Sequence, residues 1–254
     1  MLRHIGQKRT NAHNIRLACV LSLTAGFVNG AGFLSFMVFT TNVTGHVATF
    51  AEKLAAGDLH TAFVIGMWML LFLAGAFASS IIINMIGPNQ RFAYVIPIIV
   101  EIIILLIVAN NIDWWLPVPV QSLRFKAGSL LFAMGLQNAM VSMISGSVVR
   151  TTHLTGMFTD LGIELAGKLY DIKGTKSTAL SNRILLRLII IVSFFFGCII
   201  SALLYKTLKL RVFYIPAILL LGGMLFDIFR IKTVRYYRKI KSKYGTTLSS
   251  GHAE

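Results

Sequence analysis

Charged residues are scarce in this chain, and acidic residues are the scarcest of them. Asp and Glu together number 9 in 254 residues, and all charged residues make up 13% of the sequence, about half the share found in soluble domains. Hydrophobic residues reach 56%, and the mean hydropathy is +0.75. This composition excludes a soluble globular domain.

Cysteines and catalytic motifs are also rare. Cys19 and Cys198 both lie within apolar runs, so the sequence supports neither a disulfide framework nor a cysteine metal site. The chain contains no HExxH motif, the pattern in which two histidines on one helix face bind zinc. We therefore predict no metal, no cofactor and no catalytic residue, and the leading interpretation is not an enzyme.

Long apolar runs are the dominant feature of the sequence. Several approach or exceed the roughly 18 residues that a helix needs to cross the hydrocarbon core of a bilayer. They do not alternate between apolar and polar residues as the strands of a membrane barrel do. We predict an all-α integral membrane protein with six transmembrane helices, at about residues 17–39, 61–86, 92–109, 125–149, 184–205 and 212–229.

The positive charge of the chain is unevenly distributed. The net charge is +15, and most of the 24 Lys and Arg residues lie in the two tails and in one internal loop. Such clustering is typical of the cytoplasmic flanks of membrane proteins, so we place both termini in the cytoplasm and expect no nucleic-acid binding. The basic C-terminal tail is expected to contact anionic lipid.

An internal repeat runs through the sequence. GFVN at residues 26–29 matches GLQN at 135–138, and TTNVTG at 40–45 matches TTHLTG at 151–156. Further along, Gly75 with Ser79 resembles Gly197 with Ser201, and RFAYVIP resembles RVFYIP. Because these matches keep one order, we interpret the chain as two copies of one three-span unit.

An odd number of spans in each copy implies that the second copy is inverted relative to the first. Inverted repeats are common in secondary transporters, whose binding sites lie near the bilayer midplane at the repeat interface. The alternative is an old duplication retained only for packing. The predicted organisation is a basic N-tail, a first repeat, an outer linker, a second repeat and a basic C-tail, at residues 1–16, 17–110, 111–124, 125–230 and 231–254.

Each repeat is expected to contain a broken or half helix after its first span. Threonine and asparagine compete with the helix for backbone hydrogen bonds, and glycine permits a sharp bend. Thr44 and Thr155 are predicted N-caps of short helices over about 46–56 and 157–170. Such a helix either lies along the membrane interface or points its N-terminus inward, where free N–H groups would attract an anion or a polar solute.

The candidate substrate-binding residues come from the two breaks and from the asparagines that precede them. Within a membrane, an asparagine either lines a site or forms an interhelical hydrogen bond. The two histidines near the breaks do not occupy matching positions, so a metal pair is not expected, and ordinary hydrogen bonding is their default role. The candidates are Asn29, Thr41, Asn42, Thr44, Gly45, His46, Asn138, Thr152, His153, Thr155 and Gly156.

Glu101 is the most unusual single residue of the sequence. It lies in the middle of the third predicted span, where an ionised carboxylate costs several kcal/mol unless it is paired or in a wet cavity. We predict a role in proton or ion coupling for Glu101. By contrast, Asp160, Glu164 and Lys168 recur every four residues, which predicts a solvated or interfacial helix face.

The motifs GLQNA, RTTHLTG and TNVTGH resemble the YoaK family of bacterial multi-span membrane proteins, a family of unknown function. The resemblance covers about residues 15–230 and is closest over residues 135–162. The family often has Asp at the position of Asn29, and TGN where this chain has Thr44, Gly45 and His46. The resemblance implies the bacterial cytoplasmic (inner) membrane and about six helices, and it implies no particular substrate.

The leading functional hypothesis is a small secondary transporter or permease for a small polar or anionic solute, with its site at the repeat interface. One alternative is a non-transporting scaffold or assembly protein that docks through its basic C-tail on lipid or on a protein. A less favoured alternative is a membrane-embedded enzyme that uses His46, His153 or Glu101. The lipid bilayer is the expected surrounding, and the sequence is compatible with a homo-oligomer.

Overall fold

The computed structural model of the chain describes residues 11–87, 93–111, 119–170 and 177–226. Most of both predicted basic tails and half of the predicted outer linker lie outside these ranges. Every regular element in the described ranges is helical. The elements are α1 (Asn11–Phe36), α2 (Val43–Ala55), α3 (Leu59–Ile86), α4 (Val95–Ala109), α5 (Pro119–Ser145), α6 (Leu154–Leu169), α7 (Ser177–Leu208), the 3-10 turn η2 (Lys209–Phe213) and a last helical stretch over residues 214–226.

The helices confirm a membrane protein of the all-helical class. Four stretches are long and apolar enough to cross a membrane: α1, α3, most of α5, and the chain from Thr178 to Phe226, which turns at η2. The helix α4 is apolar but only 15 residues long. Large apolar side chains such as Phe63, Phe77 and Leu203 are about two-thirds exposed, as expected for surfaces that face lipid.

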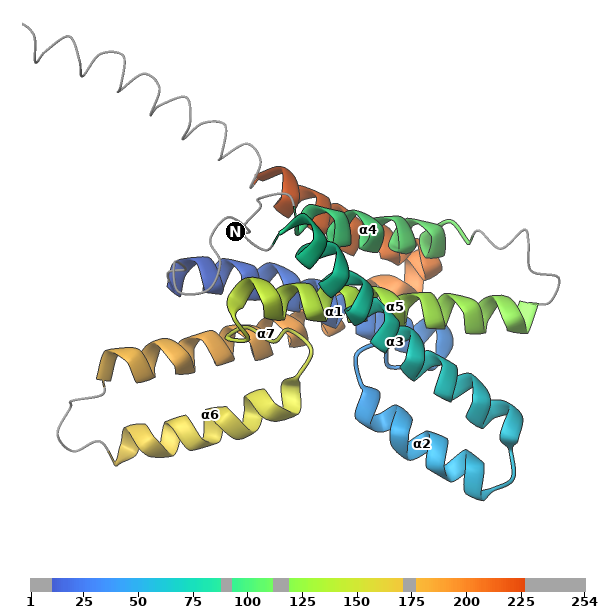
Figure 1. Ribbon diagram of the computed structural model, residues 1–254, viewed down its shortest axis with the longest axis horizontal. Helices are drawn as coiled ribbons and strands as arrows, with labels where there is room; N and C mark the ends of the chain where they lie inside the picture. Colours follow the sequence, from blue (N-terminus) through green and yellow to red (C-terminus); the bar gives the residue numbers. More distant parts are fainter. Residues whose placement is uncertain (1–10, 88–92, 112–118, 171–176, 227–254) are drawn as a thin grey trace, which may run out of the picture.

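Helices α1 and α7 cross in close contact (Figure 1). A Cβ atom added to Gly26 in α1 would overlap the carbonyl oxygen of Phe194 in α7, and one added to Gly197 in α7 would overlap the carbonyl oxygen of Leu23. Because lipid provides little hydrophobic drive for association, small residues that allow close backbone packing stabilise membrane helix pairs. The two glycines therefore set the position of this crossing.

Helices α3 and α5 form a second close crossing with the same features. A Cβ atom on Gly75 of α3 would overlap the carbonyl oxygen of Phe132, and one on Gly135 of α5 would overlap the carbonyl oxygen of Phe72. Gly26 and Gly135 occupy matching positions in the sequence repeat. Each crossing thus depends on a glycine that begins one of the similar segments GFVN and GLQN.

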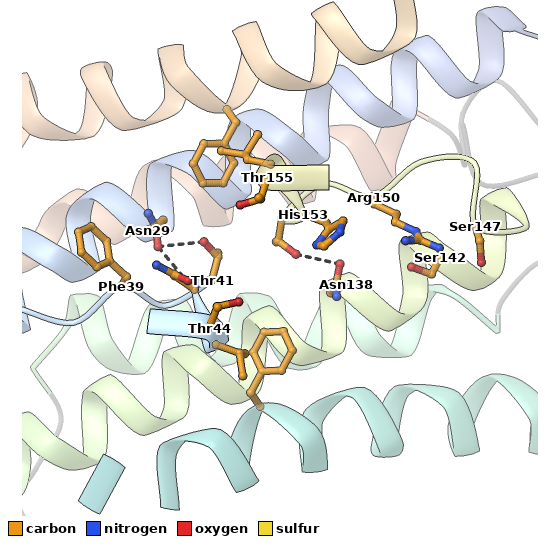
Figure 2. A pocket seen from close by; sticks show the side chains of 16 residues that line it. Asn29, Phe39, Thr41, Thr44, Asn138, Ser142, Ser147, Arg150, His153 and Thr155 are labelled. Carbon is orange, nitrogen blue, oxygen red and sulfur yellow. Dashed lines mark hydrogen bonds between the residues drawn. The ribbon is translucent and has the colours of Figure 1, made fainter. Parts of the chain in front are cut away.

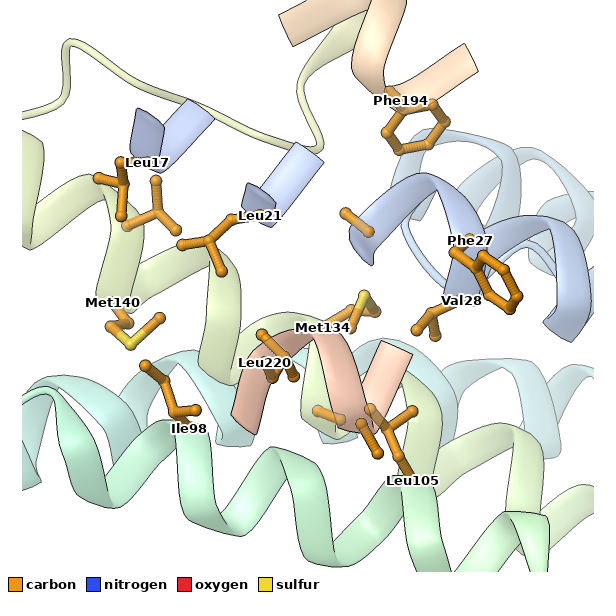
Figure 3. Packing of buried hydrophobic residues seen from close by; sticks show 14 of the residues in the cluster. Leu17, Leu21, Phe27, Val28, Ile98, Leu105, Met134, Met140, Phe194 and Leu220 are labelled. Carbon is orange, nitrogen blue, oxygen red and sulfur yellow. The ribbon is translucent and has the colours of Figure 1, made fainter. Parts of the chain in front are cut away.

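One large apolar cluster joins the two crossings. It combines side chains from α1, α4, α5, α7 and the last helical stretch, and Figure 3 shows their interdigitation. Dispersion contacts of this kind, rather than exclusion of water, hold helices together in a bilayer. The labelled members are Leu17, Leu21, Phe27, Val28, Ile98, Leu105, Met134, Met140, Phe194 and Leu220.

The short helices α2 and α6 both begin near the middle of the molecule and diverge toward opposite ends (Figure 1). Both begin earlier than predicted, and the predicted caps are wrong. The cap of α2 is Asn42, whose side-chain oxygen accepts a hydrogen bond from the Gly45 N–H at 3.0 Å, so Thr44 already lies in the first turn. The cap position of α6 is His153 rather than Thr155.

Helix α6 is held against α7 by ion pairs. Glu164 is buried, and its carboxylate accepts hydrogen bonds from Nε and a terminal nitrogen of Arg187 at 2.7 and 2.9 Å. Arg187 also contacts Asp160 at 2.9 Å, and Arg183 contacts Glu164 at 3.2 Å. The prediction of a solvated or interfacial face is therefore wrong for the buried Glu164, because the spacing of charges along α6 did not reveal the cations on α7, whereas Lys168 is exposed.

Candidate functional site

A cavity of about 710 Å³ lies where the two threonine-rich breaks meet (Figure 2). Its walls come from both breaks, from the helices α1 and α5 that precede them, and from α3 and α7. Most of the predicted binding residues line it, namely Asn29, Thr41, Asn42, Thr44, Asn138, Thr152, His153 and Thr155. The structure thus brings together two motifs that are far apart in the sequence.

Asparagine and threonine form the same contact in both halves of the cavity. The side-chain oxygen of Asn29 accepts hydrogen bonds from the Thr41 hydroxyl at 3.0 Å and from the Thr41 backbone N–H at 3.2 Å. The side-chain oxygen of Asn138 accepts one from the Thr152 hydroxyl at 2.9 Å. Each asparagine therefore ties a break to the preceding long helix and also lines the cavity.

The N-terminal ends of α2 and α6 open into this cavity. Val43 and Thr44 are the first residues of α2, Leu154 and Thr155 are the first of α6, and all four line the cavity wall. The first N–H groups of a helix have no intrahelical acceptor, and the helix dipole makes this end electropositive. Two such ends at one cavity favour a ligand with acceptor atoms or negative charge.

The first turn of α6 has no side-chain capping hydrogen bond, in contrast to the first turn of α2. At α2 the Asn42 side chain accepts from Gly45, whereas the His153 side chain makes no capping hydrogen bond. A Cβ atom on Gly156 would lie 2.4 Å from atoms of the His153 imidazole, so the ring lies close to the first turn of α6. The first turn of α6 therefore lacks the side-chain hydrogen bond that caps α2.

The charge of the cavity wall has one sign. Among its described lining residues, Arg150 is the one with a formal charge, and none is Asp or Glu. Arg150 is exposed to the cavity side and takes part in no ion pair within the described ranges. A guanidinium in the wall of a cavity that two helix N-termini also reach makes the site attractive to anions.

His46 has a structural role rather than a place in the cavity wall. It is buried, its Nε2 lies 2.8 Å from the carbonyl oxygen of Phe39, and its ring packs edge-on against Trp68. Burial lowers the pKa of His46, although the hydrogen bond with Phe39 acts in the opposite direction. Gly45 and Gly156 also lie outside the wall and instead accommodate the residues at the two cap positions.

Comparison with known proteins identifies the family of this chain. A family model described as "Protein of unknown function (DUF1275)" matches residues 17–226. The chain belongs to the DUF1275 family. It is 26% identical over 219 residues to the UPF0700 transmembrane protein YoaK of Bacillus subtilis (strain 168), an alignment that covers 84% of this chain and 94% of that protein. No solved structure matches.

Glu101 of this DUF1275 protein does not line the cavity. It lies in α4, its side chain is fully buried, and neither carboxylate oxygen has a hydrogen-bond partner within the described ranges. Ile98 and Leu105, one turn to either side, are buried in the same apolar cluster. The predicted coupling residue is thus separate from the predicted binding residues.

Several cavity residues of the DUF1275 protein escaped the sequence analysis. Phe72 and Phe194 line the wall, and each lies three residues before a glycine of the repeat, Gly75 or Gly197. Comparison of the similar segments around Gly75 and Gly197 could therefore have identified both phenylalanines from the sequence.

The other additions to the wall are Phe39, Val43, Ser142, Ser147 and Leu154. Arg150 also lines it, although the sequence favoured a positive-inside anchor over an anion contact for this residue. Within the described ranges, no group of three His, Cys, Asp or Glu side chains could hold a metal ion.

Proposed function

We propose that this protein is a small secondary transporter or permease for a small polar or anionic solute, which binds in the cavity between the two breaks. The observation that carries the proposal is the convergence of both TTxxTG segments, each with a helix N-terminus, on one cavity. Electropositive helix ends at interrupted helices are the means by which several transporter folds bind anionic groups.

The proposed architecture is two inverted units with three spans each. The first unit comprises α1, α3 and α4, the second comprises α5, α7 and the last helical stretch, and α2 and α6 are their half helices. Three observations support this arrangement: the matched glycine crossings, the matched Asn–Thr hydrogen bonds, and the opposite directions of α2 and α6. Both termini face the cytoplasm of a bacterial cell in this proposal.

The cavity can replace the hydration shell of a solute. Threonine hydroxyls, asparagine amides and free backbone N–H groups line it, and Arg150 adds a positive charge. A polar group that leaves water without such partners loses several kcal/mol. Rocking of one unit against the other would then expose the same donors to each side of the membrane in turn.

Glu101 is the proposed proton-linked group. It is buried in α4, which packs against α5 and η2, so a change of its charge would favour a different packing of α4. An ionised carboxylate in an apolar contact is costly, and water entry on helix movement would relieve that cost. Proton binding and solute binding would therefore be coupled through helix position rather than through direct contact.

The test uses purified full-length protein, in detergent for binding and in liposomes for flux. Solutes that raise the melting temperature in a screen of small anions, amino acids and neutral polar compounds are carried into flux measurements. Thr44→Val and Thr155→Val remove cavity hydroxyls and should each weaken binding and flux about tenfold while the protein still folds. Thr49→Val and Thr159→Val are matched controls, because their hydroxyls donate to carbonyls within α2 and α6.

Other results would contradict the transport proposal. If no solute is carried and the cavity variants behave as the wild type, the transport proposal is wrong. A phenotype that survives the cavity variants and is lost on deletion of residues 232–254 would support the scaffold alternative.

A further inference from the structure

A second cavity, of about 750 Å³, lies where α4 and α7 both end. Its walls come from residues 109–111, 207–211 and 214, and it shares no described lining residue with the cavity between the two breaks. The chain turns at η2 between two apolar helical stretches, α7 and the last one. Such a turn lies at a membrane surface, so this cavity faces the headgroup region of one leaflet.

The charge of this second cavity is positive. Among the described residues of its wall, the charged ones are Lys209 and Arg211, and none is Asp or Glu. Neither cation pairs with an acidic side chain in the part of the chain that the structure describes. The Lys209 ammonium lies 5.7 Å from the ring centroid of Tyr205, which carries no negative charge to neutralise it. In the proposed topology this end faces outward, where the positive-inside rule does not favour cations.

The asparagine acceptors of the wall are already occupied. The side-chain oxygen of Asn110 accepts a hydrogen bond from the Tyr214 hydroxyl at 2.5 Å, and its amide donates to the Leu106 carbonyl at 2.8 Å. The side-chain oxygen of Asn111 accepts from the Lys126 ammonium. Because these oxygens already have donors, they do not compete for the two cations, and the wall favours a ligand that brings its own acceptor atoms.

The backbone of Lys209 adopts a conformation that favours glycine. Its φ is +50°, and that of Asn111, just after α4, is +54°. Residues in this left-handed region at helix C-termini are usually Gly and sometimes Asn, so Asn111 follows the preference and Lys209 does not. Lys206 already places a cation in the last turn of α7, where the helix dipole favours one. The needs of the fold therefore do not explain a lysine at position 209, which indicates a role for its side chain.

The two cations are close enough to bind one small group. One residue separates Lys209 from Arg211, so their Cα atoms lie at most about 7 Å apart, and both residues are exposed. A phosphate has several acceptor oxygens, which a guanidinium binds through two parallel hydrogen bonds and an ammonium binds as a point charge. Leu208 in the wall and Leu203 earlier in α7 expose apolar side chains, as expected beside acyl chains.

We propose that this second cavity binds the phosphate of an anionic phospholipid through Lys209 and Arg211. In the proposed topology the lipid belongs to the outer leaflet, whereas the basic C-tail is expected to contact the cytoplasmic one. Free inorganic phosphate offers the same acceptor atoms, but the lipid-facing leucines beside the cations favour the phospholipid. The site is separate from the solute cavity and adds a lipid-binding function to the proposed transport.

The experiment measures lipid binding to purified full-length protein in detergent micelles, by native mass spectrometry and by the shift in melting temperature. The probes are phosphatidylglycerol, phosphatidylcholine with the same acyl chains, and inorganic phosphate. We expect phosphatidylglycerol to bind at least about tenfold more tightly than phosphatidylcholine, whose choline neutralises the phosphate charge. Inorganic phosphate should neither raise the melting temperature nor displace phosphatidylglycerol.

Variants distinguish the cavity from the general positive charge of the protein. Lys209→Asn suits the left-handed backbone, so it should keep or raise the melting temperature without lipid and still weaken phosphatidylglycerol binding. Combined with Arg211→Gln, it should reduce the affinity at least about tenfold and remove the preference over phosphatidylcholine. Lys206→Gln is the matched control, because it removes an exposed cation of α7 that lies outside the wall, and it should leave the affinity unchanged.

Three results would overturn the proposal. The first is an unchanged affinity in the double variant, and the second is an equal loss in Lys206→Gln, which would mean that the cations act only through overall charge. The third is stabilisation by inorganic phosphate equal to that by phosphatidylglycerol, which would assign the cavity to the free ion. Thr44→Val, a variant of the transport test, should leave lipid affinity unchanged, so failure of lipid binding and failure of transport are measured separately.

Discussion

The side-chain oxygen of Asn29 accepts two hydrogen bonds from Thr41, from its hydroxyl at 3.0 Å and from its backbone N–H at 3.2 Å. This contact fixes the start of the break relative to α1. Loss of the acceptor would leave a partly buried N–H unsatisfied, which costs about 1–3 kcal/mol. Asn29→Ala should therefore lower the free energy of unfolding by about that amount, measured by chemical denaturation in micelles.

Two variants serve as controls for Asn29. Asn29→Asp keeps an acceptor oxygen and should be less harmful than Asn29→Ala. Asn138→Ala should cost less than Asn29→Ala, because Asn138 accepts a single hydrogen bond, from Thr152. Equal losses in all three variants would show that the Asn29 contact is not what holds the break.

The glycines at the helix crossings should tolerate no side chain. Gly26→Ala and Gly135→Ala would each place a Cβ atom on a backbone carbonyl oxygen of the facing helix, which cannot move aside without separating the helices. Overpacking of this kind costs about 1–3 kcal/mol or more. The melting temperature of the purified variants measures the effect.

The matched controls for the crossings lie in α6. Gly162 and Gly167 have open space where a Cβ atom would be. Gly162→Ala and Gly167→Ala should leave stability unchanged or raise it by up to about 1 kcal/mol, because alanine favours the helix. Loss of stability in these variants comparable with that at Gly26 would contradict the packing argument.

The pair of Glu164 and Arg187 should hold α6 on α7. Their side chains are 10% and 19% exposed. Removal of Arg187 leaves the largely buried Glu164 with the exposed Arg183 as its remaining partner, so we expect a cost of up to about 3 kcal/mol. Arg187→Gln should therefore expose α6 to proteases. The double variant Glu164→Gln with Arg187→Gln should recover part of the loss, and no recovery would mean that the pair is not coupled.

Replacement of Glu101 should separate coupling from binding. Glu101→Gln keeps the size of the side chain and removes its charge, so we expect normal solute binding but no uptake driven by a pH gradient. Glu101→Leu should also raise stability, because an unpartnered buried carboxyl is replaced by an apolar group. Gradient-driven uptake that is unchanged in Glu101→Gln would rule out the coupling role.

Much of the fold was predictable because it depends on the hydropathy of continuous stretches of the chain. Within the described ranges each of the six predicted spans overlaps a helix, and four stretches are long and apolar enough to cross a membrane, because apolar length reports helical membrane segments directly. The starts of α2 and α6 were mispredicted by a few residues. Thr44 and Asn42 are both good caps in sequence, and the chosen residue depends on which side chain can reach the Gly45 N–H.

The environment of single polar residues was predicted less well. The spacing of Asp160 and Glu164 suggested a solvated face, but Arg187 on another helix makes Glu164 a buried partner. Phe39 carried no motif of its own, although it adjoins the repeated threonines, and Arg150 was read only as the first residue of RTTHLTG. Such environments depend on the neighbouring helix, which hydropathy and spacing do not identify.

The sequence by itself determined that this chain resides in a membrane, is helical and carries a duplicated polar break, because apolar length and repetition are properties of the chain alone. Only the tertiary structure decided that the two breaks share one cavity and that Phe39 and Arg150 lie at opposite ends of it. The physical reason is that helix faces meet where backbones can approach most closely, and these points are the glycine crossings at Gly26 and Gly135.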